Sequence, residues 1–222
     1  MAHAIPIDWQ SIHTVFLDMD GTLLDLHFDN YFWLEHMPKR YAEKNKLPYQ
    51  QGKDILMKHS ESTQGSLDWY CLDHWTNTVE MDVVALKHEV ADKISIRENV
   101  IPFLNHLRTL KKRVVLLTNA HSNSVKLKFA YVEIEKYFDE IITSHDIGLA
   151  KEEMGFWEAL TKHENYDKNN SLFIDDNFDV LNNAREYGIK HLLTISKPDS
   201  QKPIKDTLDY VAIDDYQQLI NE

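Results

Sequence analysis

Two aspartates, two residues apart, end a short apolar run near the start of the chain. Asp18 and Asp20 follow residues 14–17, whose β-branched and aromatic side chains predict a buried strand, and Gly21 then releases the chain into a turn. Carboxylates held close together repel one another, so the pair implies a bound cation or a shared proton. Magnesium is the cation that such oxygen-rich sites favour. A strand end with polar turn residues would have the same pattern, and the pair alone does not separate the two interpretations.

Polar side chains also follow three later segments, and their functional groups could bind an anion or a metal. They comprise a hydroxyl, an amide, an ammonium and two carboxylates, from Thr118, Asn119, Lys151, Asp175 and Asp176. Taken singly, each fits an ordinary helix cap, a solvated lysine or an acidic helix start. Ligands of open α/β sheets bind beyond the carboxyl ends of the strands. If the segments belong to one such sheet, these side chains meet the aspartate pair at one edge.

The apolar segments after about residue 98 predict an alternation of strands and helices. Expected strands cover residues 114–117, 140–143, 171–174 and 191–195, and expected helices cover 101–110, 123–130, 154–164, 179–187 and a closing stretch at 213–220. This alternation is typical of a parallel sheet covered by helices on both faces. We therefore expect an α/β fold with a Rossmann-like parallel sheet.

Residues 28–97 follow a different pattern, in which only helical periodicity is strong. Expected helices cover residues 31–46, 49–61, 66–78 and 82–93, and Pro38 either kinks the first of them or begins a new helix. The simplest organisation has two parts. Residues 1–27 and 98–222 form the sheet domain, and residues 28–97 form a helical cap inserted after the first strand.

Composition and charge limit the classes of partner. A net charge of −12 argues against binding a nucleic-acid polymer, which depends on Lys and Arg, although a small anionic substrate stays compatible. The apolar runs are too short to span a bilayer. The single cysteine, Cys71, cannot form an internal disulfide, and no basic leader precedes Lys39. We expect a cytoplasmic protein.

The four segments together resemble the four ordered motifs of the haloacid dehalogenase superfamily of phosphohydrolases. The matching residues are Asp18-Met19-Asp20-Gly21-Thr22-Leu23, then Thr118, Lys151 and Asp175-Asp176. The resemblance implies that Asp18 is a nucleophile that forms an aspartyl-phosphate and that Asp20 is the general acid/base. Proximity to Asp18 favours the raised pKa that this second role needs. Dehalogenase members of the superfamily lack the second aspartate, so Asp20 disfavours that chemistry.

The same resemblance assigns the binding residues. It implies that Thr118, Asn119 and Lys151 bind the phosphoryl group, and that Mg²⁺ is held by Asp18, Asp20, Asp175 and Asp176. Related sequences end the next helix at a glycine about twelve residues after the ligand. Gly188 lies twelve residues after Asp176, which makes Asp176 the direct ligand and Asp175 its support.

Several local features are similar to a narrower group, the bacterial GMP/IMP nucleotidases. Many relatives have proline after the lysine of the third motif, whereas this chain has Glu152. The features that match the narrower group are this Lys-Glu pair leading to Trp157, and residues 28–33, 67–73, 118–121 and 173–176. The resemblance implies a 5′-nucleotidase that dephosphorylates purine nucleoside monophosphates.

The expected cap carries side chains that suit a purine base. Stacking of a base on an aromatic ring is worth ~1–3 kcal/mol. The candidates are the rings of Tyr31, Trp33, Trp69 and Tyr70, the polar groups of Asp29, Asn30, Asp68 and Asp73 for base edges or ribose hydroxyls, and His121 as a donor. Aromatic residues at helical spacing also build helix cores, and that interpretation applies to each of the four.

Three alternatives stay open. A phosphatase or mutase of sugar phosphates would share the motif residues but bind another leaving group. A non-catalytic phosphate-binding module would need the lysine and threonine but not two carboxylates. A phosphoprotein phosphatase fits less well, because a helical cap of this size restricts access to the site.

Overall fold

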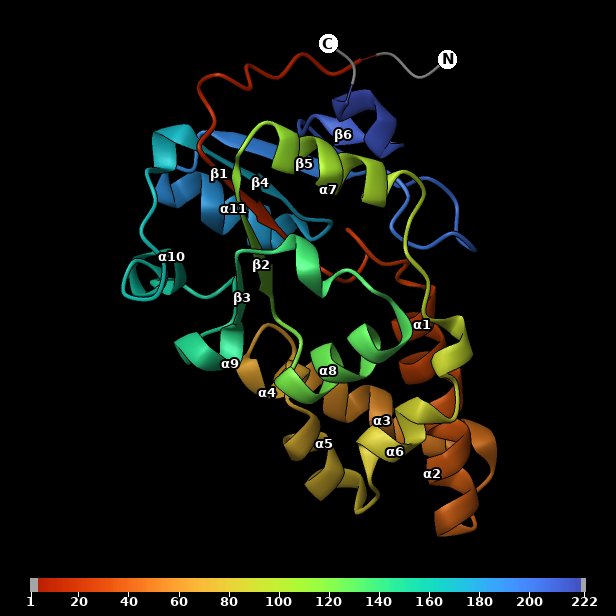
Figure 1. Cartoon of the computed structure of the whole chain (residues 1–222). Coiled ribbons are helices and arrows are strands. Elements are labelled where there is room, and N and C mark those ends of the chain that lie inside the picture. Colours follow the sequence, from red (N-terminus) through yellow and green to blue (C-terminus); the bar gives the residue numbers. More distant parts are fainter. Residues whose placement is uncertain (1–3, 221–222) are drawn as a thin grey trace.

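Six parallel strands form one sheet in the order β3-β2-β1-β4-β5-β6, in a computed structural model that describes residues 4–220 (Figure 1). The strands are β1 (Thr14–Leu17), β2 (Arg113–Thr118), β3 (Glu140–Thr143), β4 (Ser171–Ile174), β5 (His191–Ile195) and β6 (Ala212–Ile213). The order places β1 between β2 and β4, where the direction of winding reverses. The predicted α/β fold with a Rossmann-like parallel sheet is confirmed.

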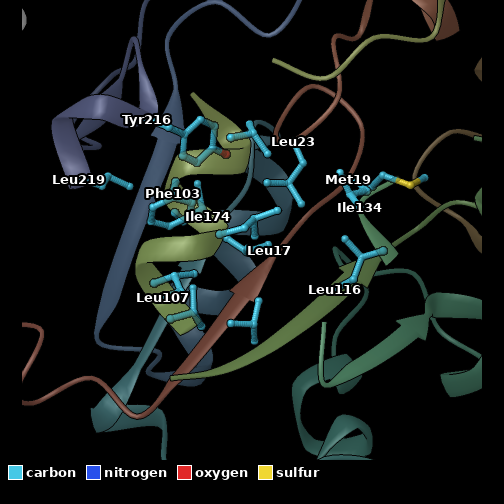
Figure 2. Close-up of a cluster of buried hydrophobic side chains, with 14 of the residues drawn as sticks. Leu17, Met19, Leu23, Phe103, Leu107, Leu116, Ile134, Ile174, Tyr216 and Leu219 are labelled. Carbon is cyan, nitrogen blue, oxygen red and sulfur yellow. The ribbon is translucent and has the colours of Figure 1, made fainter. Parts of the chain in front are cut away.

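Alternating side chains of each strand enter separate apolar layers on the two faces of the sheet. Val15 and Leu17 of β1 pack on one face, together with Phe103 from α7 (Val100–Thr109), as Figure 2 shows for part of this layer. Phe16 enters the other layer, beneath α10 (Phe156–Leu160) and α11 (Phe178–Tyr187). Full burial of a side chain of this size contributes ~1.5–3 kcal/mol, so both layers hold β1 at the centre of the sheet.

The chain between β1 and β2 forms helices that gather below the sheet in Figure 1. They are α1 (His27–Tyr31), a π-helical turn (Phe32–His36), α2 (Met37–Asn45), α3 (Tyr49–Thr63), α4 (Leu67–Tyr70), α5 (Leu72–Val79), α6 (Val83–His88) and a 3₁₀ turn (Ala91–Lys93). Their apolar side chains form a third cluster that includes Phe28, Phe32 and Trp75. Leu127 from α8 (Ser122–Tyr131) also belongs to this cluster, so a helix of the sheet domain packs against the insert.

The two connections between the insert and the sheet domain run side by side. Leu24 and Ile96 form an antiparallel bridge. The N–H of Asp25 donates to the carbonyl of Ser95 at 3.0 Å, and the N–H of Arg97 donates to the carbonyl of Leu23 at 3.0 Å. The insert therefore begins and ends at one paired junction.

Two expectations about individual elements were wrong. The expected closing helix at 213–220 is strand β6 followed by a 3₁₀ turn (Tyr216–Leu219), because Ile213 pairs with Ile195 of β5 and Asp215 caps the turn. The expected helix at 154–164 begins only after Gly155, whose φ is +88°, and ends at Leu160. The short helix α9 (Ser144–Ile147) after β3 was not predicted.

Helices in the insert are more broken than their periodicity predicts. The expected helix at 66–78 is divided at Cys71, which has extended backbone angles (φ −80°, ψ 111°). Pro38 lies in the first turn of α2 after the π-helical turn, and its missing N–H cannot bond the carbonyl of Leu34. The Tyr49 hydroxyl donates to that carbonyl instead, at 3.4 Å. Within residues 4–220, no helix has the length and apolar character needed to cross a membrane.

Candidate active site

The sheet brings the polar residues that follow β1, β2 and β4 to one edge. Asp18 follows β1, and its N–H donates to the carbonyl of Ile174 in β4 at 3.0 Å. Thr118 ends β2, and Asp175 directly follows β4. In the parallel register of β1 with β2 and β4, Asp18 and Asp175 lie at the same level of the sheet and Thr118 lies one residue further along.

A buried lysine lies at the centre of this edge. The Nζ of Lys151 donates to Asp18 Oδ1 at 2.6 Å, to Asp175 Oδ2 at 2.6 Å and to the carbonyl of Leu117 at 3.1 Å. Only 2% of Lys151 is exposed. Burial alone would lower the pKa of Lys151, but Asp175 and Asp18 outweigh it and hold that pKa above its usual value. The lysine is therefore a fixed positive charge at the base of the site.

Asp18 has one oxygen available for a ligand. Its Oδ1 accepts from Lys151, whereas its buried Oδ2 has no hydrogen-bond partner within residues 4–220. Burial raises the pKa of Asp18 to about 6, opposed by Lys151 and reinforced by Asp175. An unpartnered buried carboxylate oxygen is costly, and a ligand bound there would relieve that cost.

Three carboxylates converge closely enough to hold a metal ion. Oxygens of Asp18, Asp175 and Asp176 lie within 4.8 Å of one another. Asp175 has both oxygens engaged, by Lys151 and by the N–H of Asn177 at 2.8 Å. Burial and the charges of Asp175 and Asp18 raise the pKa of Asp176 well above its usual value. A hard divalent cation would offset this repulsion, so the donor set fits Mg²⁺.

Gly21 provides the space that the Asp176 carboxylate occupies. A Cβ at Gly21 would lie 2.7 Å from Asp176 Oδ2, and the φ of +82° is itself unfavourable for other residues. The tight turn after Asp20 therefore lets the first and fourth motifs meet.

Asp20 is held by a second buried lysine, which the sequence did not indicate. The Nζ of Lys128 donates to Asp20 Oδ1 at 2.5 Å and to Asp29 Oδ2 at 2.7 Å. Burial raises the pKa of Asp20 to about 6, opposed by Lys128 and reinforced by Asp29 and then Asp18. Burial is thus the main cause, and proximity to Asp18 contributes less than the sequence suggested. The Asp20 carboxylate is not one of the three that converge.

The lysine network continues into the insert. Lys87 of α6 donates to Asp29 Oδ1 at 2.8 Å and lies over the rings of Phe28 and Phe32, at 4.9 and 4.7 Å from their centroids. Burial alone would raise the pKa of Asp29, but Lys128 and Lys87 hold it below its usual value. Both carboxylate oxygens of Asp29 thus accept hydrogen bonds from lysines.

Asn119 supports Lys151 through its side chain. Its Oδ1 accepts from the N–H of Lys151 at 2.9 Å and from the hydroxyl of Ser144, and its Nδ2 donates to Glu152 at 2.7 Å. Glu152 accepts in turn from the hydroxyl of Tyr70 in the insert, at 2.7 Å. The Oγ1 of Thr118 accepts from the N–H of Ala120 at 3.1 Å. Sequence reasoning missed the supporting roles of Ser144 and Glu152.

A cavity of about 660 Å³ lies between this edge of the sheet and the insert. Its lining includes the motif aspartates and Lys151, together with six of the residues proposed to contact the base or ribose: Asp29, Asn30, Trp33, Trp69, Tyr70 and His121. Tyr31 is not among the lining residues, and the ammonium of Lys93 lies 4.5 Å from its ring centroid. Asn30 donates to Asp199 at 2.7 Å, and Trp69 donates to Ser60 at 2.8 Å.

Comparisons with known proteins agree with this architecture. The family model for haloacid dehalogenase-like hydrolases matches residues 12–188. The GMP/IMP nucleotidase YrfG of Escherichia coli (strain K12) is 36% identical over 216 residues, which cover 97% of each chain. The fold is similar to that of a HAD phosphatase from Thermococcus onnurineus, with a TM-score of 0.76, 18% identity and coverage of 93% and 95% of the two chains. A putative β-phosphoglucomutase from Thermotoga maritima has a TM-score of 0.66, 17% identity and coverage of 94% and 97%.

The family match includes the first strand with its aspartate pair, the buried lysine and the helix that ends at Gly188. The 36% identical relative extends the similarity over the insert as well. On these grounds the chain belongs to the haloacid dehalogenase-like hydrolases.

Proposed function

We propose that this hydrolase is a magnesium-dependent phosphatase that dephosphorylates purine nucleoside monophosphates such as GMP and IMP. The observation that carries the proposal is the buried Lys151 between Asp18 and Asp175 at the base of the cavity, with Asp20 beside them. The substrate class rests on the 36% identical GMP/IMP nucleotidase and on the aromatic side chains of the cavity.

In the first half of the reaction, the Asp18 carboxylate attacks phosphorus and the bond to the ester oxygen breaks. Asp20 donates its proton to the departing oxygen, so the nucleoside leaves with a hydroxyl group and Asp18 carries an aspartyl-phosphate. A pKa of about 6, set mainly by burial, leaves part of the Asp20 population protonated near neutral pH. Covalent catalysis of this kind replaces one difficult step with two easier ones.

In the second half, Asp20 accepts a proton from water as that water attacks the aspartyl-phosphate. The bond between Asp18 and phosphorus breaks, inorganic phosphate leaves, and both carboxyl groups return to their starting states. Lys151, which exchanges one of its three present acceptors for the substrate, and Thr118 bind the phosphoryl oxygens in both halves, and Asn119 holds Lys151 in position. Positioning and charge stabilisation are the main contributions that a protein makes to phosphoryl transfer.

Asp18 and Asp176 would hold Mg²⁺, with Asp175 supporting them through Lys151. When bound, the ion supplies positive charge that stabilises the phosphoryl group and the carboxylates around it. The convergence of two buried carboxylates and the half-buried Asp176, together with the unpartnered Asp18 Oδ2, supports this assignment.

Residues 28–97 act as the cap over the site. Their paired junction at Leu24 and Ile96 supports movement of the insert as one unit relative to the sheet. A volume of about 660 Å³ falls within the ~300–1,000 Å³ that small-molecule sites usually have. Trp33, Trp69 and Tyr70 offer ring faces or edges to a purine.

A panel of phosphate monoesters tests both the reaction and the substrate. The purified full chain with Mg²⁺ is given GMP, IMP, pyrimidine nucleotides, sugar phosphates and a phosphotyrosyl peptide, and released phosphate is measured. We expect the highest kcat/KM for GMP or IMP, and loss of activity after removal of Mg²⁺ with a chelator. A preference for sugar phosphates would overturn the substrate assignment. Absence of hydrolysis with every ester would overturn the proposed function.

A further inference from the structure

A thiol and two imidazoles meet beside the cavity, at the boundary between the insert and the sheet domain. Each of Cys71, His121 and His145 offers one ligand atom, and these atoms lie within 4.8 Å of one another. Cys71 lies between α4 and α5 of the insert, His121 follows β2, and His145 lies in α9 after β3. The cluster is separate from the aspartates, and the proposed reaction makes no use of Cys71 or His145.

The backbone fixes each of the three side chains. Cys71 is the extended N-cap of α5, and its Sγ accepts from the N–H of His74 at 3.5 Å. His121 is the N-cap of α8, and its Nδ1 accepts from the N–H of Asn123 at 3.3 Å. In the neutral ring that contact places the proton on His121 Nε2, 3.7 Å from a carboxylate oxygen of Asp73, so binding a metal through Nε2 requires the ring to exchange the Asn123 contact for the other tautomer.

His145 carries an unsatisfied polar atom. Its Nε2 is shielded from solvent and has no hydrogen-bond partner in the part of the chain that the structure describes. The rings of His145 and His121 meet edge to face, with centroids 4.8 Å apart. A buried imidazole nitrogen without a partner is costly, and a metal ion is one ligand that would satisfy it.

We propose that Cys71, His121 and His145 form a binding site for Zn²⁺ that joins the insert to the sheet domain. A thiolate and two imidazoles form a soft donor set, which selects Zn²⁺ over the Mg²⁺ that the aspartates favour. Tetrahedral zinc sites have metal–ligand distances of about 2.0–2.3 Å, which place ligand atoms about 3.5 Å apart. Because the three atoms already lie within 4.8 Å of one another, they need to approach by at most about 1.3 Å on binding. The thiol proton is released on binding.

Bound Zn²⁺ restrains the cap. The ion ties Cys71 of the insert to two histidines of the sheet domain, and His121 itself lines the cavity. Release of product from a capped site needs the cap to move, so a bridge of this kind inhibits turnover. The inhibition rests on the phosphatase activity proposed above, whereas the binding does not.

Binding is tested by titrating the full chain with Zn²⁺ against a chromophoric chelator, with Mg²⁺ in excess. We expect one Zn²⁺ per chain, and affinity at least about 10-fold lower in Cys71→Ser and in His145→Gln. His163→Gln, which removes an exposed histidine, and Asp18→Asn are controls that keep the wild-type affinity. Co²⁺ in place of Zn²⁺ gives a thiolate-to-metal charge-transfer absorption that Cys71→Ser loses. Circular dichroism shows that each variant folds.

Two results would overturn the site. Zn²⁺ that fails to bind, or that binds equally well to Cys71→Ser and His145→Gln, excludes these ligands. Binding lost only in Asp18→Asn assigns the ion to the aspartates. Inhibition is tested separately. The Zn²⁺ concentration that inhibits the wild type should be at least about 10-fold lower than the concentration that inhibits Cys71→Ser. Equal sensitivity would overturn the restraint of the cap. A chain that hydrolyses no phosphate ester overturns the proposed function, and the titration still decides the metal site.

Discussion

Two buried lysines of the sheet domain contact the two aspartates of the first motif, and they differ in where their second aspartate partner lies. Lys151 binds Asp18 and Asp175, and all three belong to the sheet domain. Lys128 binds Asp20 and Asp29, and Asp29 lies in α1 of the insert. The lysine that contacts the proposed nucleophile therefore has both of its aspartate partners in the sheet domain, whereas the lysine that contacts the proposed acid/base also binds an aspartate of the cap.

Because of this difference, we expect the binding of phosphate and the transfer of protons to depend on the cap to different extents. The groups proposed to bind phosphate, Lys151 and Thr118, both belong to the sheet domain, where Lys151 contacts Asp18 and Asp175. Asp20 shares Lys128 with Asp29, so its placement depends on whether the first helix of the insert is in contact with the sheet domain. Hydrolysis by water would then be fastest only when the cap is closed.

Asp18→Asn should have the largest effect. The amide is a far weaker nucleophile than a carboxylate, and loss of a covalent catalyst commonly costs ~10⁴-fold or more in kcat. Phosphate release from GMP measures the loss, and Asp92→Asn, at an exposed aspartate, is the matched control. Residual activity within tenfold of the wild type would mean that Asp18 is not the attacking group.

Lys151→Met should come next, because it removes the charge on which both Asp18 and Asp175 depend. Removing one partner of a buried ion pair costs ~3–5 kcal/mol of folding stability, and loss of a charge-stabilising donor costs ~10²–10³-fold in kcat. Urea unfolding and phosphate release measure the two losses. Lys162→Met, at an exposed lysine, should change neither. A stable and active variant would show that Asp18 and Asp175 do not depend on the charge of Lys151.

Lys128→Met should have a smaller effect that depends on the leaving group. The loss cannot exceed the whole acid/base contribution of ~10²–10⁴-fold, and we expect roughly 10²-fold with GMP. p-Nitrophenolate leaves without a proton, so the loss with p-nitrophenyl phosphate should be several-fold smaller. Lys126→Met, at an exposed lysine of the same helix, is the control. Equal losses with both substrates would show that Lys128 does not act through Asp20.

The contrast between the two lysines also shows what the sequence could and could not predict. Lys151 was predicted because it follows a loop at a fixed place in the order of the motifs. Lys128 and Lys87 lie on buried faces of α8 and α6, and nothing in a single sequence indicates that their partners are distant aspartates. A lysine among apolar helical residues is a weak signal, since most lysines extend their charge into solvent.

The same distinction applies to the fold. Strands β1 to β5 were predicted because each is a run of apolar residues that both layers bury. Strand β6 has only two residues, and its pairing with β5 decides its conformation, so local periodicity indicated a helix instead. The breaks at Cys71 and Gly155 likewise depend on caps and turns that periodicity does not register.

Tyr70→Phe should have the smallest effect, and it tests whether the sheet end of the site is fully independent of the cap. The Tyr70 hydroxyl is linked to Lys151 through Glu152 and then Asn119. Loss of a hydrogen bond to a charged acceptor costs ~1.5–3 kcal/mol where it is made, and two intervening residues should dilute this to less than about 10-fold in kcat. A larger fall in kcat at unchanged KM would mean that the placement of Lys151, like that of Lys128, depends on the position of the cap. The two ends of the cavity would then respond to closure together.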